Sequence, residues 1–248
     1  MSLVGINIEE FVKGGCIGVI QTGFGHPLDT MKTLKQYSSV KHKNVTSQGL
    51  TMKGLFSGMS YPLMVNVIYN SGVFGIYSLG LQNEIETSVS GFIAGGVMSF
   101  LLNPFEYYKV QQQMKGNMKV RDISPMFLNV EKSKKRERLN KIIDFWKNGY
   151  VGIQYTFLRE SLATGIYFKT YEMMKTWGAS PFFAGGVAGC NSWLLTYPID
   201  TMKTRYQLDT RMDWKVTLRR GGLFDGLAFC LVRAFLVNGI SFTFYEMV

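Results

Sequence analysis

The sequence predicts an all-α membrane protein with six transmembrane helices, arranged as three tandem two-helix repeats. Three observations lead to this fold class: long uncharged stretches, motifs that occur three times at fixed offsets, and basic residues that gather in three segments. The chain has 248 residues, of which 46% are hydrophobic and 18% are charged. This composition suits either one large globular domain or a membrane protein, and the distribution of charge decides between them.

The uncharged stretches are long enough to cross a bilayer as helices. Residues 54–83, 87–105 and 176–199 contain no Asp, Glu, Lys or Arg. A helix of about 20 residues crosses the roughly 30 Å of hydrocarbon in a membrane. These three segments are therefore predicted to be transmembrane.

The net charge of +10 comes mainly from three basic segments: 35–53, 115–147 and 211–220. If six helices span the membrane, these segments all fall on one side, whereas the opposite connections, near 83–87 and 175–180, are short and carry few charges. This is the positive-inside pattern. The densest run, EKSKKRER at 131–138, is interpreted as a solvated loop because no stacking platform or DNA-binding motif accompanies it. Nucleic acid is therefore not an expected partner.

The cysteines and the start of the chain bear on its compartment. Cys16, Cys190 and Cys230 lie in apolar segments without metal-like spacing, so neither a disulfide framework nor a metal site is predicted. The start, MSLVGINIEEF, has two glutamates and no arginine, which argues against a secretory signal and an Arg-rich transit peptide. Any targeting information is expected to be internal.

One motif recurs around three prolines, Pro27, Pro104 and Pro198. An acid follows each proline by two residues, a lysine by five and a glutamine by nine: Asp29, Glu106 and Asp200; Lys32, Lys109 and Lys203; Gln36, Gln113 and Gln207. Glycines precede each proline by 13 and 9 residues, and such small-xxx-small stripes let helix backbones approach closely in lipid. Each proline lacks a backbone donor and is predicted to kink its helix.

A second motif opens the other helix of each repeat with an aromatic-x-Gly step, at 56–58, 150–152 and 224–226. A tyrosine stands nineteen residues beyond each glycine: Tyr77, Tyr171 and Tyr245. Agreement over that distance predicts an uninterrupted helix of about five turns. The predicted repeats are residues 1–85, 86–178 and 179–248, which together form one domain.

These residues resemble the mitochondrial carrier family, whose signature is proline, any residue, acid, two residues and base, once in each of three two-helix units. The likeness covers essentially the whole chain. It implies six helices around a pseudo-threefold axis, a central water-filled cavity and short amphipathic helices on the matrix face. It also implies a transporter rather than an enzyme, working by alternating access without a cofactor. Bound cardiolipin at the matrix side is an accompanying expectation.

The resemblance assigns a gating role to the charges of the proline motif. An acid and a lysine three residues apart can pair within one helix, worth about 0.2–0.5 kcal/mol, but in a ring they can also pair between neighbours. The implied pairs are Asp29 with Lys109, Glu106 with Lys203, and Asp200 with Lys32. They would close the matrix end, and Gln36, Gln113 and Gln207 would brace them.

The opposite gate of the family is an aromatic, an acid, two residues and a base on each even-numbered helix. Five residues of the second and third repeats match it: Tyr171, Glu172, Lys175, Tyr245 and Glu246. The first repeat keeps Tyr77 but has Ser78 and Leu81 at the charged positions. A weak outer gate is therefore predicted, with the matrix network contributing most of the gating energy.

The resemblance assigns substrate contact to the positions seven and eight residues past the aromatic-x-Gly glycines, which we call the substrate level. The predicted substrate-binding residues at this level are Asn66, Arg159, Glu160 and Arg233. The charged ones interrupt apolar stretches, and ionisable groups inside a membrane usually face a cavity or one another. A purely structural role for Arg159 and Glu160 is the alternative.

An Arg–Glu pair beside a second arginine can hold a carboxylate and an ammonium together, because a guanidinium binds carboxylates through a bidentate fork. This predicts a zwitterionic or cationic metabolite, such as an amino acid or a carnitine ester. The segments FLRESLATGIYFKTYE and VRAFLVNGISFTFYE look like the carnitine/acylcarnitine and basic amino-acid branch. Two arginines and the positive net charge would also attract phosphates, so nucleotide or deoxynucleotide exchange stays open. A non-transporting structural or regulatory role is disfavoured by the intact matrix motifs.

The expected location is the mitochondrial inner membrane, with both termini towards the intermembrane space. Peroxisomes and plastids stay open because relatives of the fold work there. The chain is expected to be a monomer whose partners are membrane lipid, a small-molecule substrate and a counter-substrate.

Overall fold

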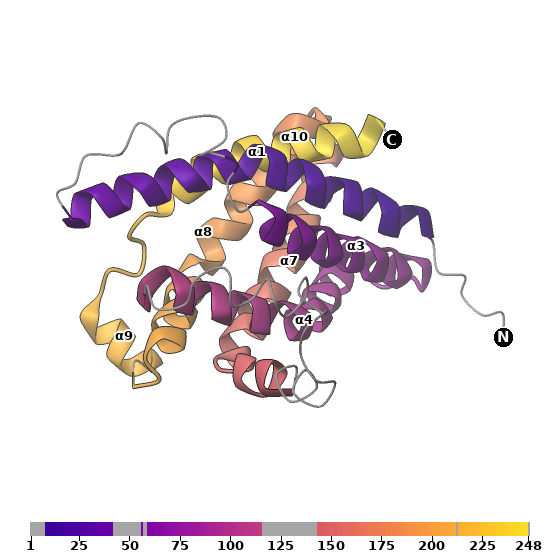
Figure 1. The fold of residues 1–248 in the computed structure, drawn as a ribbon. Coiled ribbons are helices and arrows are strands. Elements are labelled where there is room, and N and C mark those ends of the chain that lie inside the picture. Colours follow the sequence, from indigo (N-terminus) through magenta and orange to yellow (C-terminus); the bar gives the residue numbers. More distant parts are fainter. Residues whose placement is uncertain (1–7, 42–55, 57–58, 116–142, 212, 248) are drawn as a thin grey trace, which may run out of the picture.

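The computed structural model describes residues 8–41, 56, 59–115, 143–211 and 213–247, and the side chains of all of these except 27–41, 60–61, 109–115, 208 and 220. Within this part the chain is helical and contains no strand, which confirms the predicted all-α class. Its long helices are α1 (Ile8–Lys41), α3 (Ser60–Gln82), α4 (Thr87–Lys115), α7 (Ile153–Thr176), α8 (Pro181–Leu208) and α10 (Leu227–Met247) (Figure 1).

The long helices form a closed ring that follows their order in the chain (Figure 1). α1 packs against α3, α4 against α7, and α8 against α10. These helix pairs contact one another through α3 and α4, α7 and α8, and α10 and α1. Each pair therefore contributes to a common interior, where residues distant in the sequence meet.

The glycine stripes allow the two helices of each pair to pack closely. A Cβ added at the first glycine of each stripe would approach a carbonyl oxygen of the facing helix, at 2.5 Å for Gly14 and Asn70, 2.8 Å for Gly91 and Thr164, and 2.7 Å for Gly185 and Asn238. Each facing residue stands twelve positions beyond its aromatic-x-Gly glycine. The three helix pairs therefore pack in the same register, and a larger side chain at these glycines would force them apart.

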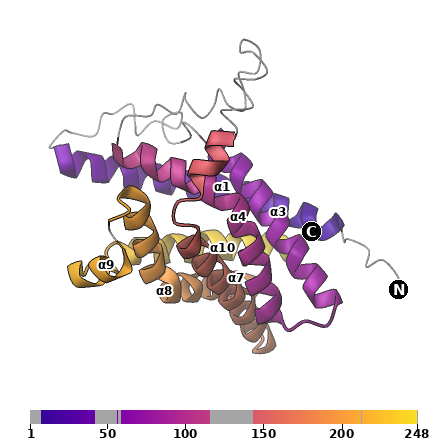
Figure 2. The ribbon, with the colours of Figure 1, turned by 90° about the horizontal axis from the view of Figure 1, so that it is seen from below.

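The helices continue through the prolines whose side chains are described. Pro104 lies inside α4 and Pro198 inside α8. The side chain of Pro27, on α1, lies outside those described. Shorter helical segments precede two of the long helices: residues 143–149 before α7, and α9 (Trp214–Arg220) before α10. α9 lies beside the end of α8 (Figure 2).

Within the described part, two helices are apolar and long enough to cross a membrane by composition, Thr87–Tyr108 and Leu227–Met247. The first contains the predicted span 87–105. The predicted spans 54–83 and 176–199 fall largely in α3 and α8, whose polar side chains lower their mean hydropathy. Asn70 on α3, for example, faces the interior and is 7% exposed. The six-span arrangement and the repeat boundaries stay predictions.

Candidate functional site

Arg159 lies at the centre of a buried charge cluster formed by Arg159, Glu160, Glu106, Asp200 and Lys203. Its Nη2 contacts Glu160 and lies 3.4 Å from Glu106 Oε1. Its Nε lies 3.4 Å from Asp200 Oδ1. Lys203 Nζ binds the other oxygen of Glu106. Since these residues come from α4, α7 and α8, the charge cluster joins the second and third helix pairs.

The charge cluster combines two sets of residues that the sequence assigns to different levels. Glu106, Asp200 and Lys203 belong to the proline motif, whereas Arg159 and Glu160 belong to the substrate level. Lys203 binds Glu106, the pairing expected for these two residues, while Asp200 contacts Arg159. The remaining motif residues lie outside the described side chains, so their roles stay predictions: Asp29, Lys32, Gln36, Lys109 and Gln113.

The charge cluster joins three carboxylates to two cations. Three of its members are buried, with Arg159 8%, Glu160 4% and Lys203 3% exposed, while the Glu106 and Asp200 side chains are 27% and 29% exposed. Removing charges from water costs several kcal/mol per ion, roughly, unless partners compensate it. Among the described side chains, each of these carboxylates contacts Arg159 or Lys203, and these cations reduce that cost.

Two aromatic residues border the charge cluster. The Tyr69 hydroxyl donates a hydrogen bond of 2.6 Å to Glu160 Oε2. The Arg159 guanidinium lies 5.7 Å from the centroid of the Trp193 ring, within the range of a cation–π contact. Neither residue was predicted. Tyr69 follows Asn66 by three residues and therefore lies on the same face of the helix, so extending the substrate level by one turn would have included it.

Amide and hydroxyl side chains contact one another in the interior beside α1, α3 and α10. Asn66 donates to Thr22 at 3.0 Å, and Asn70 donates to Gln21 at 3.2 Å. Gln21 in turn donates to Asn238 at 3.5 Å. The predicted substrate-binding residue Asn66 therefore lies in an amide-rich region supplied by the first and third helix pairs.

Arg233, the remaining predicted substrate-binding residue, faces α1. A Cβ added at Gly25 would lie 3.0 Å from Arg233 Nη2. Arg159, in contrast, is engaged by acids from α4 and α8. The two arginines thus lie against different helices.

Gln207 is the gate brace whose side chain is described. Its amide donates to Asn103 Oδ1 and to the Val151 carbonyl, both at 3.3 Å. Asn103 donates to the Gly149 carbonyl at 2.6 Å. These contacts tie α8 to α4 and to the segment that leads into α7. Asn103 precedes Pro104 directly but has no counterpart of the same type in the other two motifs, which is why counting missed it.

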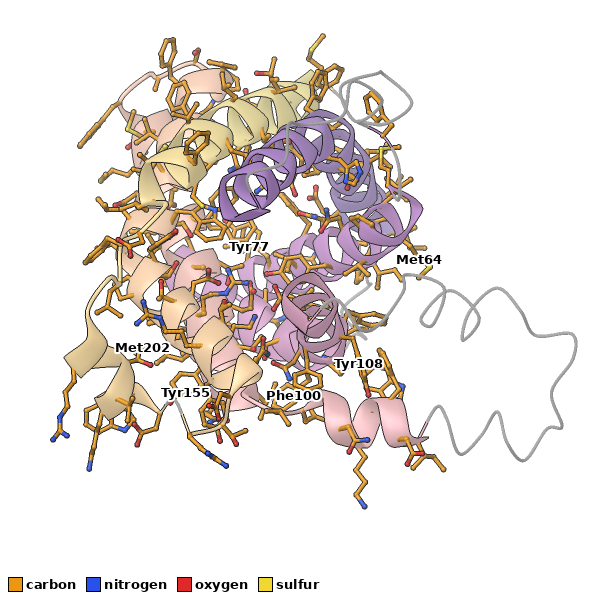
Figure 3. The ribbon with its side chains drawn as sticks, turned by 60° about the vertical axis from the view of Figure 1, so that its left-hand side comes forward. Met64, Tyr77, Phe100, Tyr108, Tyr155 and Met202 are labelled. Carbon is orange, nitrogen blue, oxygen red and sulfur yellow. The ribbon has the colours of Figure 1, made fainter. Side chains whose placement is uncertain are left out.

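Six aromatic residues fill the opposite end of the interior. This aromatic cluster consists of Phe74, Phe168 and Phe242, which are 3%, 3% and 1% exposed, and of Tyr77, Tyr171 and Tyr245. Tyr77 stacks on Phe168 at 3.7 Å between ring centroids and lies inside the bundle in Figure 3. Each phenylalanine precedes its tyrosine by three residues, one turn of helix, so the count that found the tyrosines could have found them.

Charged groups beside the aromatic cluster connect α7 with α10. Lys175 Nζ lies 2.7 Å from Glu246 Oε1, and the Tyr171 hydroxyl donates to the same carboxylate at 2.5 Å. Three of the five predicted outer-gate residues therefore meet across a helix-pair boundary. Glu172, in contrast, pairs with Lys169, at 3.3 Å.

Residues of α1 and of the turn before α4 also reach this end. Tyr245 donates to Glu10 Oε2 at 2.9 Å, and Lys169 Nζ lies 3.4 Å from Glu86 Oε1. The Ser88 hydroxyl, followed by Lys169, lowers the pKa of the Glu86 carboxyl below its usual range, so that it is ionised at neutral pH. Glu10, Glu86 and Lys169 were not predicted, since none belongs to a threefold pattern.

The whole sequence was compared with known proteins. It matches the family described as mitochondrial carrier protein over residues 80–181 and 177–248. It is also 31% identical to the mitochondrial arginine transporter BAC2 of Arabidopsis thaliana, over 96% of this chain and 90% of that protein. The chain belongs to the mitochondrial carrier family. As a mitochondrial carrier it is a solute transporter rather than an enzyme, and a multi-pass protein of the mitochondrial inner membrane.

Two further relatives place this carrier near the basic amino-acid branch. It is 29% identical to the mitochondrial basic amino acids transporter of Rattus norvegicus, over 94% of this chain and 86% of that protein. It is 28% identical to the mitochondrial ornithine transporter 1 of Schizosaccharomyces pombe, over 92% of this chain and 87% of that protein. The predicted resemblance is therefore confirmed at the level of family and branch.

Proposed function

We propose that this carrier exchanges basic amino acids, such as arginine or ornithine, across the mitochondrial inner membrane. The observation that carries the proposal is the Glu160 carboxylate, which is 4% exposed and lies at the substrate level beside Arg159. A basic amino acid has a net charge of about +1 at neutral pH, since its ammonium and side-chain cation outnumber its carboxylate. One of its cationic groups would pair with this carboxylate, and relatives named for arginine, ornithine and basic amino acids support the same class.

The separation of the two arginines suggests how such a ligand would bind. The substrate carboxylate would bind Arg233, which lies against α1, because guanidinium and carboxylate form strong charge-assisted hydrogen bonds. The side-chain cation would bind near Glu160 and Glu106, in the charge cluster. Asn66 would complete the contact level from the first helix pair. Substrate of this shape would thereby touch all three pairs.

Transport would proceed by alternating access through six spans in three repeats around a pseudo-threefold axis. The matrix gate would consist of the acids and lysines of the proline motif, and the aromatic cluster with its charged neighbours would form the outer gate. Because Arg159 contacts both Glu160 and Asp200, substrate binding at Glu160 would loosen a matrix-gate acid. Binding and gate opening would thus be coupled, which favours exchange of substrate against counter-substrate. A monomer with bound cardiolipin and both termini in the intermembrane space belongs to the same proposal.

Nucleotide exchange is disfavoured by the same group of carboxylates. A triphosphate would bring several further negative charges close to Glu106, Glu160 and Asp200. Like charges in a site of low dielectric repel strongly. A carnitine ester, whose quaternary ammonium is cationic, is compatible with the cluster and serves as a second cationic probe.

The test is uptake of labelled arginine into liposomes that contain the purified carrier. The liposomes would be preloaded with ornithine, a carnitine ester, a nucleotide or buffer alone. We expect uptake with ornithine inside and little uptake with nucleotide or buffer, because exchange requires a cationic counter-substrate. Transport of labelled nucleotide against nucleotide, without arginine uptake, would overturn the proposed substrate class.

A further inference from the structure

Tyr69 brings the first helix pair into contact with the charge cluster. Its hydroxyl donates to Glu160 Oε2 at 2.6 Å, while Arg159 contacts the other oxygen, Oε1. Glu160 is 4% exposed, so water has little access to either oxygen. The two oxygens of this buried carboxylate therefore have different partners, from different helices.

The Tyr69 ring is held in place by packing. The ring is partly buried. It packs against the core residues around the aromatic cluster and also against a second core group that contains Val65, Leu102 and Phe105. A hydroxyl on a fixed ring is a directional donor, and hydrogen bonds to a carboxylate are among the stronger ones in proteins. Tyr69 thus determines how the Glu160 carboxylate is turned.

We propose that Tyr69 is a positioning residue that sets the preference of Glu160 for a cationic substrate group. This inference rests on the proposed function. Without the hydroxyl, the Glu160 carboxylate can turn both oxygens towards the Arg159 guanidinium in a bidentate pair. Such a pair would leave Glu160 less available to the substrate. The specificity for cations over neutral analogues would then fall although Glu160 itself is unchanged.

The experiment compares Tyr69→Phe with the wild type in ligand-induced thermal stabilisation and in exchange. Arginine and its neutral analogue citrulline are the probes. We expect the apparent affinity for arginine to fall about tenfold or more, as on loss of one hydrogen bond to a charged group, while the weaker response to citrulline stays the same. Tyr108→Phe is the matched control, because Tyr108 stacks on Phe145 at 4.7 Å, away from the charge cluster.

A double variant tests whether Tyr69 acts through Glu160. If it does, Tyr69→Phe should have no further effect on arginine binding in a Glu160→Gln background, because the two residues share one interaction. Additive losses, or an unchanged arginine affinity in Tyr69→Phe, would overturn the inference. Failure of the wild type to bind or exchange any cationic amino acid would instead overturn the proposed function. Thermal stabilisation reports binding even for a variant that does not transport.

A separate observation concerns the outer gate, for which α3 lacks both charges. Glu10 at the start of α1 accepts from Tyr245 at 2.9 Å, and Glu86, just before α4, pairs with Lys169 at 3.4 Å. The Glu10 contact connects the first helix pair to α10, which Ser78 and Leu81 cannot reach by charge. The Glu86 contact holds the turn between α3 and α4 against α7. Together with Lys175 and Glu246, they link all three pairs at this end.

We infer that Glu10, on α1, supplies the outer-gate contact to α10 that the first repeat lacks on α3, and that Glu86 holds the turn between α3 and α4 against α7. Each is exposed to a degree that makes a single contact weak, typically about 0–1 kcal/mol. Their effect comes from adding to the contacts around the buried aromatic cluster. The outer gate thus gains contacts that do not follow the repeat pattern.

Reactivity of a buried thiol tests this gate without requiring transport. In a protein with its three native cysteines replaced by serine, Phe74→Cys places a thiol where the side chain is 3% exposed. Adding Glu10→Gln and Glu86→Gln should raise its rate of alkylation in detergent several-fold, because the gate opens more often. Glu84→Gln is the control, since Glu84 is an exposed residue of the same turn.

Reversing the charges of the Lys169–Glu86 pair is the second part of this alkylation experiment. Lys169→Glu alone should raise alkylation, and Lys169→Glu with Glu86→Lys should lower it again. An alkylation rate that is the same in all gate variants would overturn this inference, whatever the transported substrate. A rate that rises equally with Glu84→Gln would show a general loosening of the turn and would overturn it as well.

Discussion

Arg159 on α7 contacts Asp200 on α8, with 3.4 Å between Nε and Oδ1. The contact joins a residue of the substrate level in one helix pair to an acid of the proline motif in the next. A ligand that competes for either residue must therefore disturb the other. This relationship is the physical basis for coupling between substrate binding and the matrix gate.

Two replacements of Arg159 should distinguish the role of its positive charge from the role of its planar guanidinium. Arg159→Ala leaves three buried carboxylates with one lysine, and removing one partner of buried ion pairs costs about 3–5 kcal/mol. We expect transport to be abolished and the unfolding temperature to fall. Arg159→Lys keeps the charge but loses the fork, so we expect a folded protein with at least about tenfold slower exchange. Normal arginine exchange by Arg159→Ala would contradict the site.

The contact between Glu106 and Lys203 should tolerate an exchange of the acid and the base between the two positions. Glu106→Lys alone places a cation beside Lys203 and Arg159, and Lys203→Glu alone adds a fourth carboxylate to the charge cluster. Both should block exchange. The double variant restores one acid and one base between α4 and α8, so we expect partial recovery, measured as arginine–ornithine exchange. No recovery in a double variant with wild-type thermal stability would argue against this pair as a gate.

Two glycines of α1 should respond differently to alanine. At Gly14 the new Cβ would lie 2.5 Å from the Asn70 carbonyl, so Gly14→Ala forces α1 and α3 apart at a cost of about 1–3 kcal/mol. At Gly23 a Cβ meets nothing within 4 Å, and Gly23→Ala should be neutral or stabilise the helix by up to about 1 kcal/mol. Thermal unfolding of the two variants in detergent measures the difference. Equal effects would contradict the close packing of this pair.

The aromatic cluster should act as the seal of the outer end. Phe168→Ala removes a side chain that is 3% exposed and contacts both Phe74 and Tyr77. Such a cavity costs about 3–5 kcal/mol. We expect lower stability and a higher uptake of arginine into liposomes without counter-substrate. Phe183→Ala, at a position that is 58% exposed, is the control and should change neither.

Much of the architecture could be read by counting from the prolines and the aromatic-x-Gly glycines. That count identified Gly14, Gly91 and Gly185, and the structure shows them packed in one register. It also identified the level of Asn66, Arg159 and Glu160, because a fixed number of residues along a regular helix corresponds to the same height and the same face in each repeat. Residues one turn away, such as Phe74 and Tyr69, were within reach of the same count.

Partners across the ring could not be counted in this way. The repeat offsets show which positions of the three repeats correspond to one another. A contact between two helix pairs depends instead on the length of the side chains and on how the ring of helices closes. Tyr245 and Glu10 are 235 residues apart and meet because α10 packs against α1. Arg159 enters the charge cluster because its long side chain reaches the acids of α4 and α8. Local periodicity thus specified the helices and their facing residues, while the contacts of Arg159 and Glu10 followed from three-dimensional proximity, because only closure of the ring brings their partners within reach.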